Sequence, residues 1–127
     1  MSCHVLVVED EPCISELLAM ILEDAGYFVV VVSDGEAALM ALNDAPYDLV
    51  VSDIMLPRLN GLDLIEAMRA NLALAAIPVV LMSAVQPNRL MSVPHAAFVK
   101  KPFDLDSMVA TVGMALTTAA PSQAIPA

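Results

Sequence analysis

Short apolar runs alternate along the chain with longer segments in which apolar residues recur every three or four positions. The short runs are rich in Val, Ile and Leu, as expected of strands that are buried on both faces. Five strands are predicted in this way, over His4–Val8, Tyr27–Val32, Tyr47–Ser52, Ile77–Met82 and Ala97–Lys100.

The longer segments have the periodicity of amphipathic helices. Pro12 suits a first helical turn and Gly26 suits the position just past a helix end. The segment Ser33-Asp34-Gly35-Glu36 has the spacing of a capping box. Helices are therefore predicted over Pro12–Ala25, Glu36–Asn43, Gly61 to about Leu72, and Asp104–Leu116.

Strands that alternate with helices in this manner predict an α/β fold with a doubly wound parallel sheet of five strands. A length of 127 residues fits one domain with a substantial core. The last residues are small, uncharged and contain two prolines. We expect one domain over residues 1–118 and a flexible C-terminal tail over residues 119–127.

The charges are unevenly distributed. Residues 1–57 contain eleven Asp and Glu and no Lys or Arg, whereas the rest of the chain contains four acidic and five basic residues, which gives a net charge of −10. This acidity argues against nucleic acid and anionic membrane as partners. The two longest uncharged runs, residues 70–88 and 107–127, are each interrupted by two prolines, so no membrane span is predicted.

The amino terminus has no basic region before its first apolar run, which argues against a signal peptide. Cys3 and Cys13 form neither a disulfide framework nor a metal motif. A cytoplasmic location is therefore predicted.

Polar side chains follow the predicted strands at the edge where open α/β sheets bind ligands. They are Glu9, Asp10 and Glu11 after the first strand, Asp53 after the third, Ser83 after the fourth, and Lys100 and Lys101 after the fifth. Two carboxylates about 4 Å apart repel each other by about 4 kcal/mol at an effective dielectric of about 20. Such a cluster needs a lysine or a hard cation such as Mg²⁺.

These groups suit phosphoryl transfer. An Asp carboxylate can act as a nucleophile and form an aspartyl phosphate. A metal ion, a Lys ammonium and a Ser hydroxyl would then bind the phosphoryl oxygens, so that catalysis consists of positioning and charge neutralisation.

The sequence closely resembles the receiver domain of two-component response regulators over residues 4–116. The matching stretches are VLVVEDEP (5–12), DAGY (24–27), SDGEAAL (33–39), YDLVVSDIMLPRLNGLDLIEAMR (47–69), IPVVLMSA (77–84) and FVKKPFDLDSM (98–108). The resemblance implies a flavodoxin-like sheet with the strand order 2-1-3-4-5.

The resemblance also assigns the metal site. Asp53 matches the phosphoacceptor of the family. Glu9 and Asp10 match its acidic pair, with Asp10 as the direct Mg²⁺ ligand. Met55 would offer its backbone carbonyl to the same ion.

The remaining site residues come from the later strands. Ser83 matches the hydroxyl that contacts the phosphoryl group and moves on activation. Lys101, rather than Lys100, matches the family's lysine because it directly precedes Pro102, and this peptide bond is usually cis in the family. Phe98 falls at the aromatic switch position.

The segment between Ser83 and Lys101 departs from the family pattern. It is short, and Pro87 and Pro94 leave room only for a helix of one to two turns, around Asn88–Met91. The fourth helix, fifth strand and fifth helix form the output or dimer face in the family, so we expect this face to be altered.

A second prediction concerns the lifetime of the phosphorylated form. Met55 and Val85 lie two residues after Asp53 and Ser83, at positions that tune the access of water to the acyl phosphate in the family. Both are apolar, so slow self-dephosphorylation is expected.

The primary hypothesis is a response regulator receiver rather than an enzyme. It takes a phosphoryl group from a sensor histidine kinase or a phosphotransfer protein onto Asp53 and assists that reaction. Because the chain ends soon after the last helix, output is expected through a protein partner or a homodimer, unless the chain is a fragment.

Two alternatives remain open. A Mg²⁺-dependent phosphohydrolase with an Asp nucleophile is disfavoured, because the haloacid dehalogenase type needs an acid/base Asp where Met55 stands. A receiver-like binding module that works without phosphorylation is disfavoured by the complete set of Asp10, Asp53 and Lys101.

Overall fold

The structure is a computed structural model, and it describes residues 3–84 and 95–124. Its five strands are β1 (His4–Val8), β2 (Phe28–Val32), β3 (Leu49–Asp53), β4 (Val79–Ser83) and β5 (Ala97–Lys100). All neighbouring strands pair in parallel, in the order β2-β1-β3-β4-β5. The predicted fold and strand order are confirmed.

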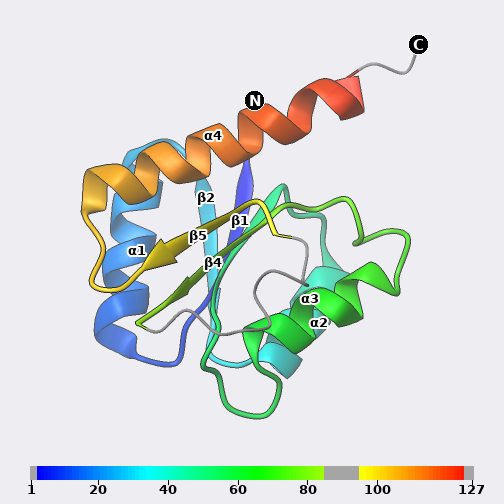
Figure 1. The fold of residues 1–127 in the computed structure, drawn as a ribbon, viewed down its shortest axis with the longest axis horizontal. Helices are drawn as coiled ribbons and strands as arrows, with labels where there is room; N and C mark the ends of the chain where they lie inside the picture. Colours follow the sequence, from blue (N-terminus) through cyan, green and yellow to red (C-terminus); the bar gives the residue numbers. More distant parts are fainter. Residues whose placement is uncertain (1–2, 85–94, 125–127) are drawn as a thin grey trace.

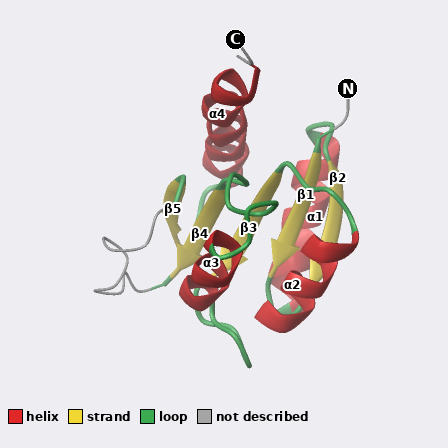
Figure 2. Cartoon of the chain, turned by 90° about the vertical axis from the view of Figure 1, so that its right-hand side faces the viewer, coloured by secondary structure: helices red, strands yellow, loops and turns green. Residues whose placement is uncertain are grey.

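The described helices cover both faces of this sheet. They are α1 (Pro12–Asp24), α2 (Gly35–Asp44), α3 (Gly61–Arg69) and α4 (Leu105–Ala124). Figure 1 shows α1 and α4 on one side of the strands and α2 and α3 on the other, and Figure 2 gives the perpendicular view. The arrangement is the three-layer sandwich expected of a parallel sheet.

The alternation of side chains along each strand divides the core into two halves. In β1, Leu6 and Val8 pack with buried residues of α2 and α3, whereas Val5 and Val7 pack with buried residues of α1 and α4. The apolar residues of β1, β3 and β4 are almost fully buried. The polar residues Glu9, Asp53 and Ser83 are found at the carboxyl ends of these three buried central strands.

Two helix ends differ from the prediction. Helix α3 ends at Arg69 and not near Leu72, whose side chain is 95% exposed. Helix α4 continues to Ala124, so the predicted end at Leu116 is wrong and residues 119–124 are helical. Figure 1 shows its last turns extending past the sheet, where no apolar periodicity is needed. The domain boundary at residue 118 stays a prediction.

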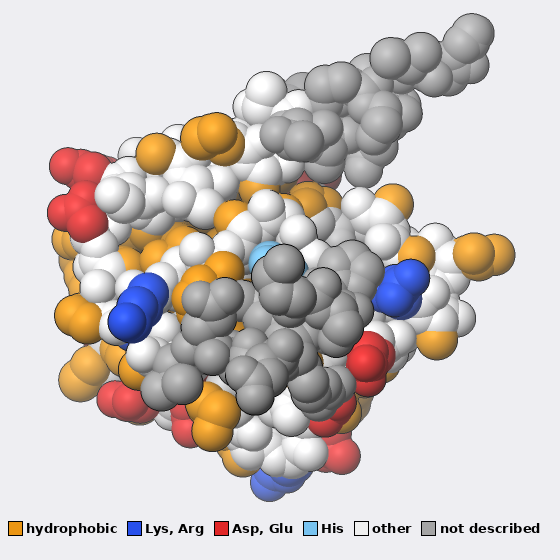
Figure 3. Space-filling model, viewed as in Figure 1, with side chains coloured by type: hydrophobic (Ala, Val, Ile, Leu, Met, Phe, Trp, Pro, Cys, Tyr) orange, Lys and Arg blue, Asp and Glu red, His pale blue; other side chains and the backbone are white. Residues whose placement is uncertain are grey.

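The predicted short helix around Asn88–Met91 and the predicted role of Val85 lie outside the described residues. None of the described helices is long and apolar enough to cross a membrane. On the face shown in Figure 3, the basic side chains stand apart from one another.

Candidate functional site

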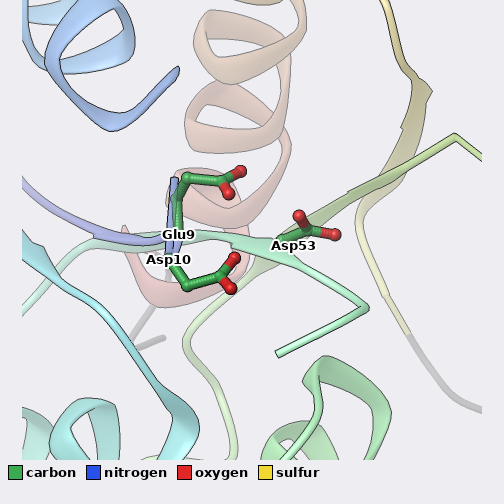
Figure 4. Close-up of side chains that lie close together, drawn as sticks. All are labelled: Glu9, Asp10 and Asp53. Atoms are coloured by element: carbon green, nitrogen blue, oxygen red, sulfur yellow. The ribbon is translucent and has the colours of Figure 1, made fainter. Parts of the chain in front are cut away.

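Three carboxylates meet at the carboxyl edge of the sheet. Glu9 and Asp10 follow β1, and Asp53 is the last residue of β3, the strand beside β1. One carboxylate oxygen from each of the three residues lies within 4.8 Å of the other two, and Figure 4 shows the three side chains together at the ends of these strands. Glu9 and Asp53 are only 2% and 6% exposed, whereas Asp10 is exposed to solvent.

Lys101 supplies the positive charge of the site. Its Nζ atom lies 2.8 Å from Glu9 Oε1 and 2.7 Å from Asp53 Oδ2. The lysine follows β5, and β4 separates this strand from β3, so a long side chain is needed to reach Asp53. The peptide bond from Lys101 to Pro102 is cis, as the resemblance predicts. Lys100 is exposed to solvent.

Burial and charge act on the two ends of this ion pair in different ways. Burial raises the pKa of the Glu9 carboxyl above its ordinary value, although the hydrogen bonds from Lys101 and from the Glu11 amide oppose the shift. Burial also lowers the pKa of the Lys101 ammonium, but the hydrogen bonds and charges of Asp53 and Glu9 together outweigh it and raise that pKa. Lys101 is therefore a permanent cation at neutral pH.

The loop after β3 contacts the second carboxylate oxygen of Asp53. The Met55 N–H donates to Asp53 Oδ1 at 3.1 Å, while Lys101 occupies Oδ2. The Met55 side chain itself is 72% exposed, so its apolar surface lies beside the site and faces solvent. Its carbonyl as a metal ligand stays a prediction.

Ser83 and Phe98 lie on the two strands beyond β3. Ser83 ends β4 and is 2% exposed, and its carbonyl accepts a hydrogen bond from the Lys101 N–H at 2.9 Å. Phe98 is partly buried and packs against the core on the side of α2 and α3. Their switch roles stay predictions.

The donor set fits a hard divalent cation. Glu9, Asp10 and Asp53 provide only oxygen atoms, and Mg²⁺ prefers such ligands together with retained water. A cavity of about 360 Å³ opens beside Glu9 and Asp10 and is also lined by Ser15 and Ser33, which leaves room for water. The three carboxylates and Lys101 carry a formal charge of −2, which one divalent ion would neutralise.

Sequence reasoning missed a second ion pair near the site. Arg58, in the loop after β3, contacts Asp34, which caps helix α2. The two residues are far apart in sequence and both lie in connecting segments. Only the capping-box spacing, which marks the start of α2, pointed to one of them.

Comparisons with known proteins agree with this geometry. A family model described as the response regulator receiver domain matches residues 5–113. The DNA-binding response regulator MtrA of Mycolicibacterium smegmatis is 34% identical over 113 residues, which cover 86% of this chain and 48% of that protein. The chain spans about half the length of the curated relatives it matches.

Solved structures show the same fold. The chemotaxis response regulator CheY4 of Vibrio cholerae superposes with a TM-score of 0.85 at 25% identity, and the match covers 91% of this chain and 99% of that one. The signal receiver domain of a signal transduction histidine kinase from Syntrophus aciditrophicus gives a TM-score of 0.87 at 28% identity, with 92% of each chain covered. The chain belongs to the response regulator receiver domain family.

Proposed function

We propose that Asp53 is the phosphoacceptor of this receiver and that phosphorylation requires Mg²⁺. The observation that supports the proposal is that each carboxylate oxygen of Asp53 has its own hydrogen-bond donor. Asp53 Oδ2 contacts the Lys101 ammonium and Oδ1 accepts the Met55 N–H, with Glu9 and Asp10 beside them. The same contacts that orient the nucleophile also place a cation where phosphoryl oxygens would arrive.

In this reaction a carboxylate oxygen of Asp53 attacks the phosphorus of a phosphohistidine. A new O–P bond forms, the P–N bond breaks, and its electron pair leaves with the imidazole of the donor. Lys101 neutralises charge on the transferred group, and the Ser83 hydroxyl offers a further hydrogen bond. When bound by Glu9, Asp10 and Asp53, Mg²⁺ supplies the remaining charge neutralisation.

The donor on this proposal is a sensor histidine kinase or a phosphotransfer protein, and the domain resides in the cytoplasm. Phosphorylation biases a two-state equilibrium through Ser83 and Phe98. A protein partner or a second copy of the chain recognises the change on the face that includes β5 and α4.

Acetyl phosphate with Mg²⁺, followed by intact mass spectrometry, tests the proposal. We expect a gain of one phosphoryl group in the wild type and none in Asp53→Asn, or in the wild type with EDTA. Ser33→Ala is the control, because it changes a polar residue beside the carboxylates without removing a carboxylate. Catalytic phosphate release would instead indicate a hydrolase. A wild type that stays unmodified would indicate a phosphorylation-independent binding module.

The same preparation tests the lifetime of the phosphorylated form. Met55 presents an apolar, exposed side chain beside Asp53, so it cannot orient an attacking water. We expect slow self-dephosphorylation, and a phosphorylated form that decays within seconds would contradict this.

A further inference from the structure

A second charge cluster joins the loop after Asp53 to helix α2. Arg58 Nη1 lies 2.7 Å from Asp34 Oδ2, and Arg58 Nε lies 3.9 Å from Glu36 Oε1. Asp34 is 7% exposed, whereas 62% of the Arg58 side chain is exposed. The arginine therefore reaches from the surface to a buried carboxylate in a neighbouring segment.

The position of the Asp34 side chain is fixed by a contact that does not involve Arg58. Its Oδ1 accepts the Ala37 N–H at 2.8 Å and so caps α2, which leaves Oδ2 for Arg58. An ion pair with one fixed and buried partner loses less side-chain entropy than an ordinary surface pair, which often contributes little. Arg58 thus has a fixed acceptor.

The backbone of Arg58 shows that its position is a constrained one. Its φ angle is 66°, in the left-handed region that residues other than Gly, Asn and Asp seldom adopt. Glycine would take this conformation without strain. The chain instead has an arginine here, whose guanidinium reaches Asp34 from this backbone conformation.

The rest of the loop is packed closely against the same two elements. A Cβ atom on Gly35, the first residue of α2, would lie 2.1 Å from the Leu59 carbonyl oxygen. A Cβ atom on Gly61 would lie 2.6 Å from the Asp53 carbonyl oxygen. The Gly61 N–H also donates to the Ile54 carbonyl at 2.9 Å and closes the loop.

The loop begins directly after the acceptor, so its shape sets the position of the Met55 backbone. We propose that Arg58, through its ion pair with Asp34, is a positioning residue that fixes this loop on α2 and thereby holds the Met55 backbone against Asp53. This inference rests on the proposed function of Asp53 as a Mg²⁺-dependent phosphoacceptor. Arg58 acts through the loop and does not touch the phosphoryl group.

Two variants separate the ion pair from other effects. Arg58→Gly removes the guanidinium and also relieves the left-handed strain, so the loop loses its contact without a backbone penalty. Asp34→Asn keeps an oxygen that can cap α2 but removes the charge that Arg58 contacts. Arg69→Gln, in the last turn of α3, removes an exposed positive charge elsewhere and serves as the control.

The first measurement is amide hydrogen exchange of residues 54–59 in the metal-free protein. We expect faster exchange of this loop in Arg58→Gly and Asp34→Asn, with no change in β3 or in Arg69→Gln. If this loop exchanges at the wild-type rate in both variants, the proposal is overturned, regardless of the Mg²⁺ affinity that the variants show.

The second measurement is Mg²⁺ affinity by calorimetry, together with the rate of phosphorylation by acetyl phosphate, well below the thermal midpoint. We expect both variants to bind Mg²⁺ about tenfold more weakly, as when an outer-shell partner of a metal site is removed. Arg58→Gly should keep its thermal midpoint, which a merely structural role would not predict. Affinity and rate within twofold of the wild type would refute the positioning role. A wild type that neither binds Mg²⁺ nor accepts phosphate would refute the proposed function and, with it, this inference.

Discussion

Lys101→Met is the most informative perturbation of the site, because it removes the cation and keeps a side chain of similar length. In the metal-free protein the change leaves Glu9, Asp10 and Asp53 within 4.8 Å of one another. Lys101 is the one cation that contacts Glu9 or Asp53 in the described part of the chain. The variant therefore isolates the cost of uncompensated carboxylates.

The repulsion between two carboxylates and the protonation of Glu9 together limit that cost. Two unit charges at the outer distance of 4.8 Å repel each other by about 3.5 kcal/mol at an effective dielectric of about 20. Protonation of Glu9 sets an upper limit, since moving its pKa from the ordinary 4.5 to neutral pH corresponds to about 3.4 kcal/mol at about 1.4 kcal/mol per pH unit. Removing one partner of a buried pair typically costs about 3–5 kcal/mol. We expect Lys101→Met to lower the free energy of unfolding by about 3 kcal/mol at pH 7.

The sign of the pH dependence follows from Glu9. Burial already raises the pKa of this carboxyl in the folded protein, and loss of Lys101 raises it further. The folded state then binds a proton that the unfolded state has released, so stability is present below the ordinary value of 4.5 and is lost as the pH rises above it. The deficit of the variant should shrink as the pH falls from 7 towards 5.

Urea unfolding without metal at pH 5 and pH 7 measures this deficit. Lys100→Met, a neighbouring exposed lysine, is the matched control and should change stability by less than about 0.5 kcal/mol. Mg²⁺ should stabilise Lys101→Met more than the wild type, because the ion no longer meets an ammonium group, with KCl at equal ionic strength as the salt control. A deficit below about 1 kcal/mol at pH 7, or one that does not depend on pH, would refute the reasoning.

Three further variants test neighbouring features. Gly61→Ala should lower the free energy of unfolding by about 2 kcal/mol or more, because its Cβ would lie 2.6 Å from the Asp53 carbonyl oxygen; urea unfolding unchanged within error would contradict this contact. The Ala37 N–H holds the pKa of Asp34 below its ordinary value, so the stabilisation from this carboxylate is lost as the pH falls below about 4. Asp34→Asn should remove that part of the acid dependence in unfolding curves at low pH, and an unchanged acid limb would argue against it. Asp10→Asn should weaken Mg²⁺ binding by about tenfold or more in calorimetry without lowering the metal-free thermal midpoint, since it relieves repulsion; a lower midpoint would show that Asp10 stabilises the fold directly.

The sheet and the gathering of polar residues at one of its edges were predictable because they depend on local patterns. Buried parallel strands are continuous apolar runs, so each strand end marks a position on one edge of the sheet. Glu9, Asp53 and Ser83 each lie directly at such an end. The choice between Lys100 and Lys101 came from Pro102. In the structure Lys100 is exposed and Lys101 contacts Asp53, and the role of Lys101 stays a prediction.

Helix ends and loop contacts were not predictable in the same way. Apolar periodicity reports which residues are buried and not which residues are helical, so the apolar stripe that ends at Leu116 does not mark the end of α4, which continues to Ala124. The contact between Arg58 and Asp34 joins two connecting segments and depends on a left-handed backbone angle. No spacing rule on a strand or helix specifies such a contact.

The uneven charge distribution has a direct structural consequence. Residues 1–57 contain no Lys or Arg. Two later residues provide positive charge to two groups of carboxylates in this part of the chain. Lys101 neutralises part of the charge on Glu9 and Asp53, and Arg58 neutralises Asp34. Lys101 contacts the Asp53 side chain, and Arg58 lies in the loop that follows Asp53.

The net charge around Asp53 bears on the order in which a metal ion and a phosphoryl donor can bind. Glu9, Asp10, Asp53 and Lys101 sum to a formal charge of −2, so a phosphoryl donor, itself anionic, is repelled by the metal-free site. A divalent cation brings the sum to zero. On the proposal that Asp53 accepts the phosphoryl group, we therefore expect Mg²⁺ to bind before the donor. Lys101 alone is not expected to replace the ion, because its ammonium group is already shared between two buried carboxylates.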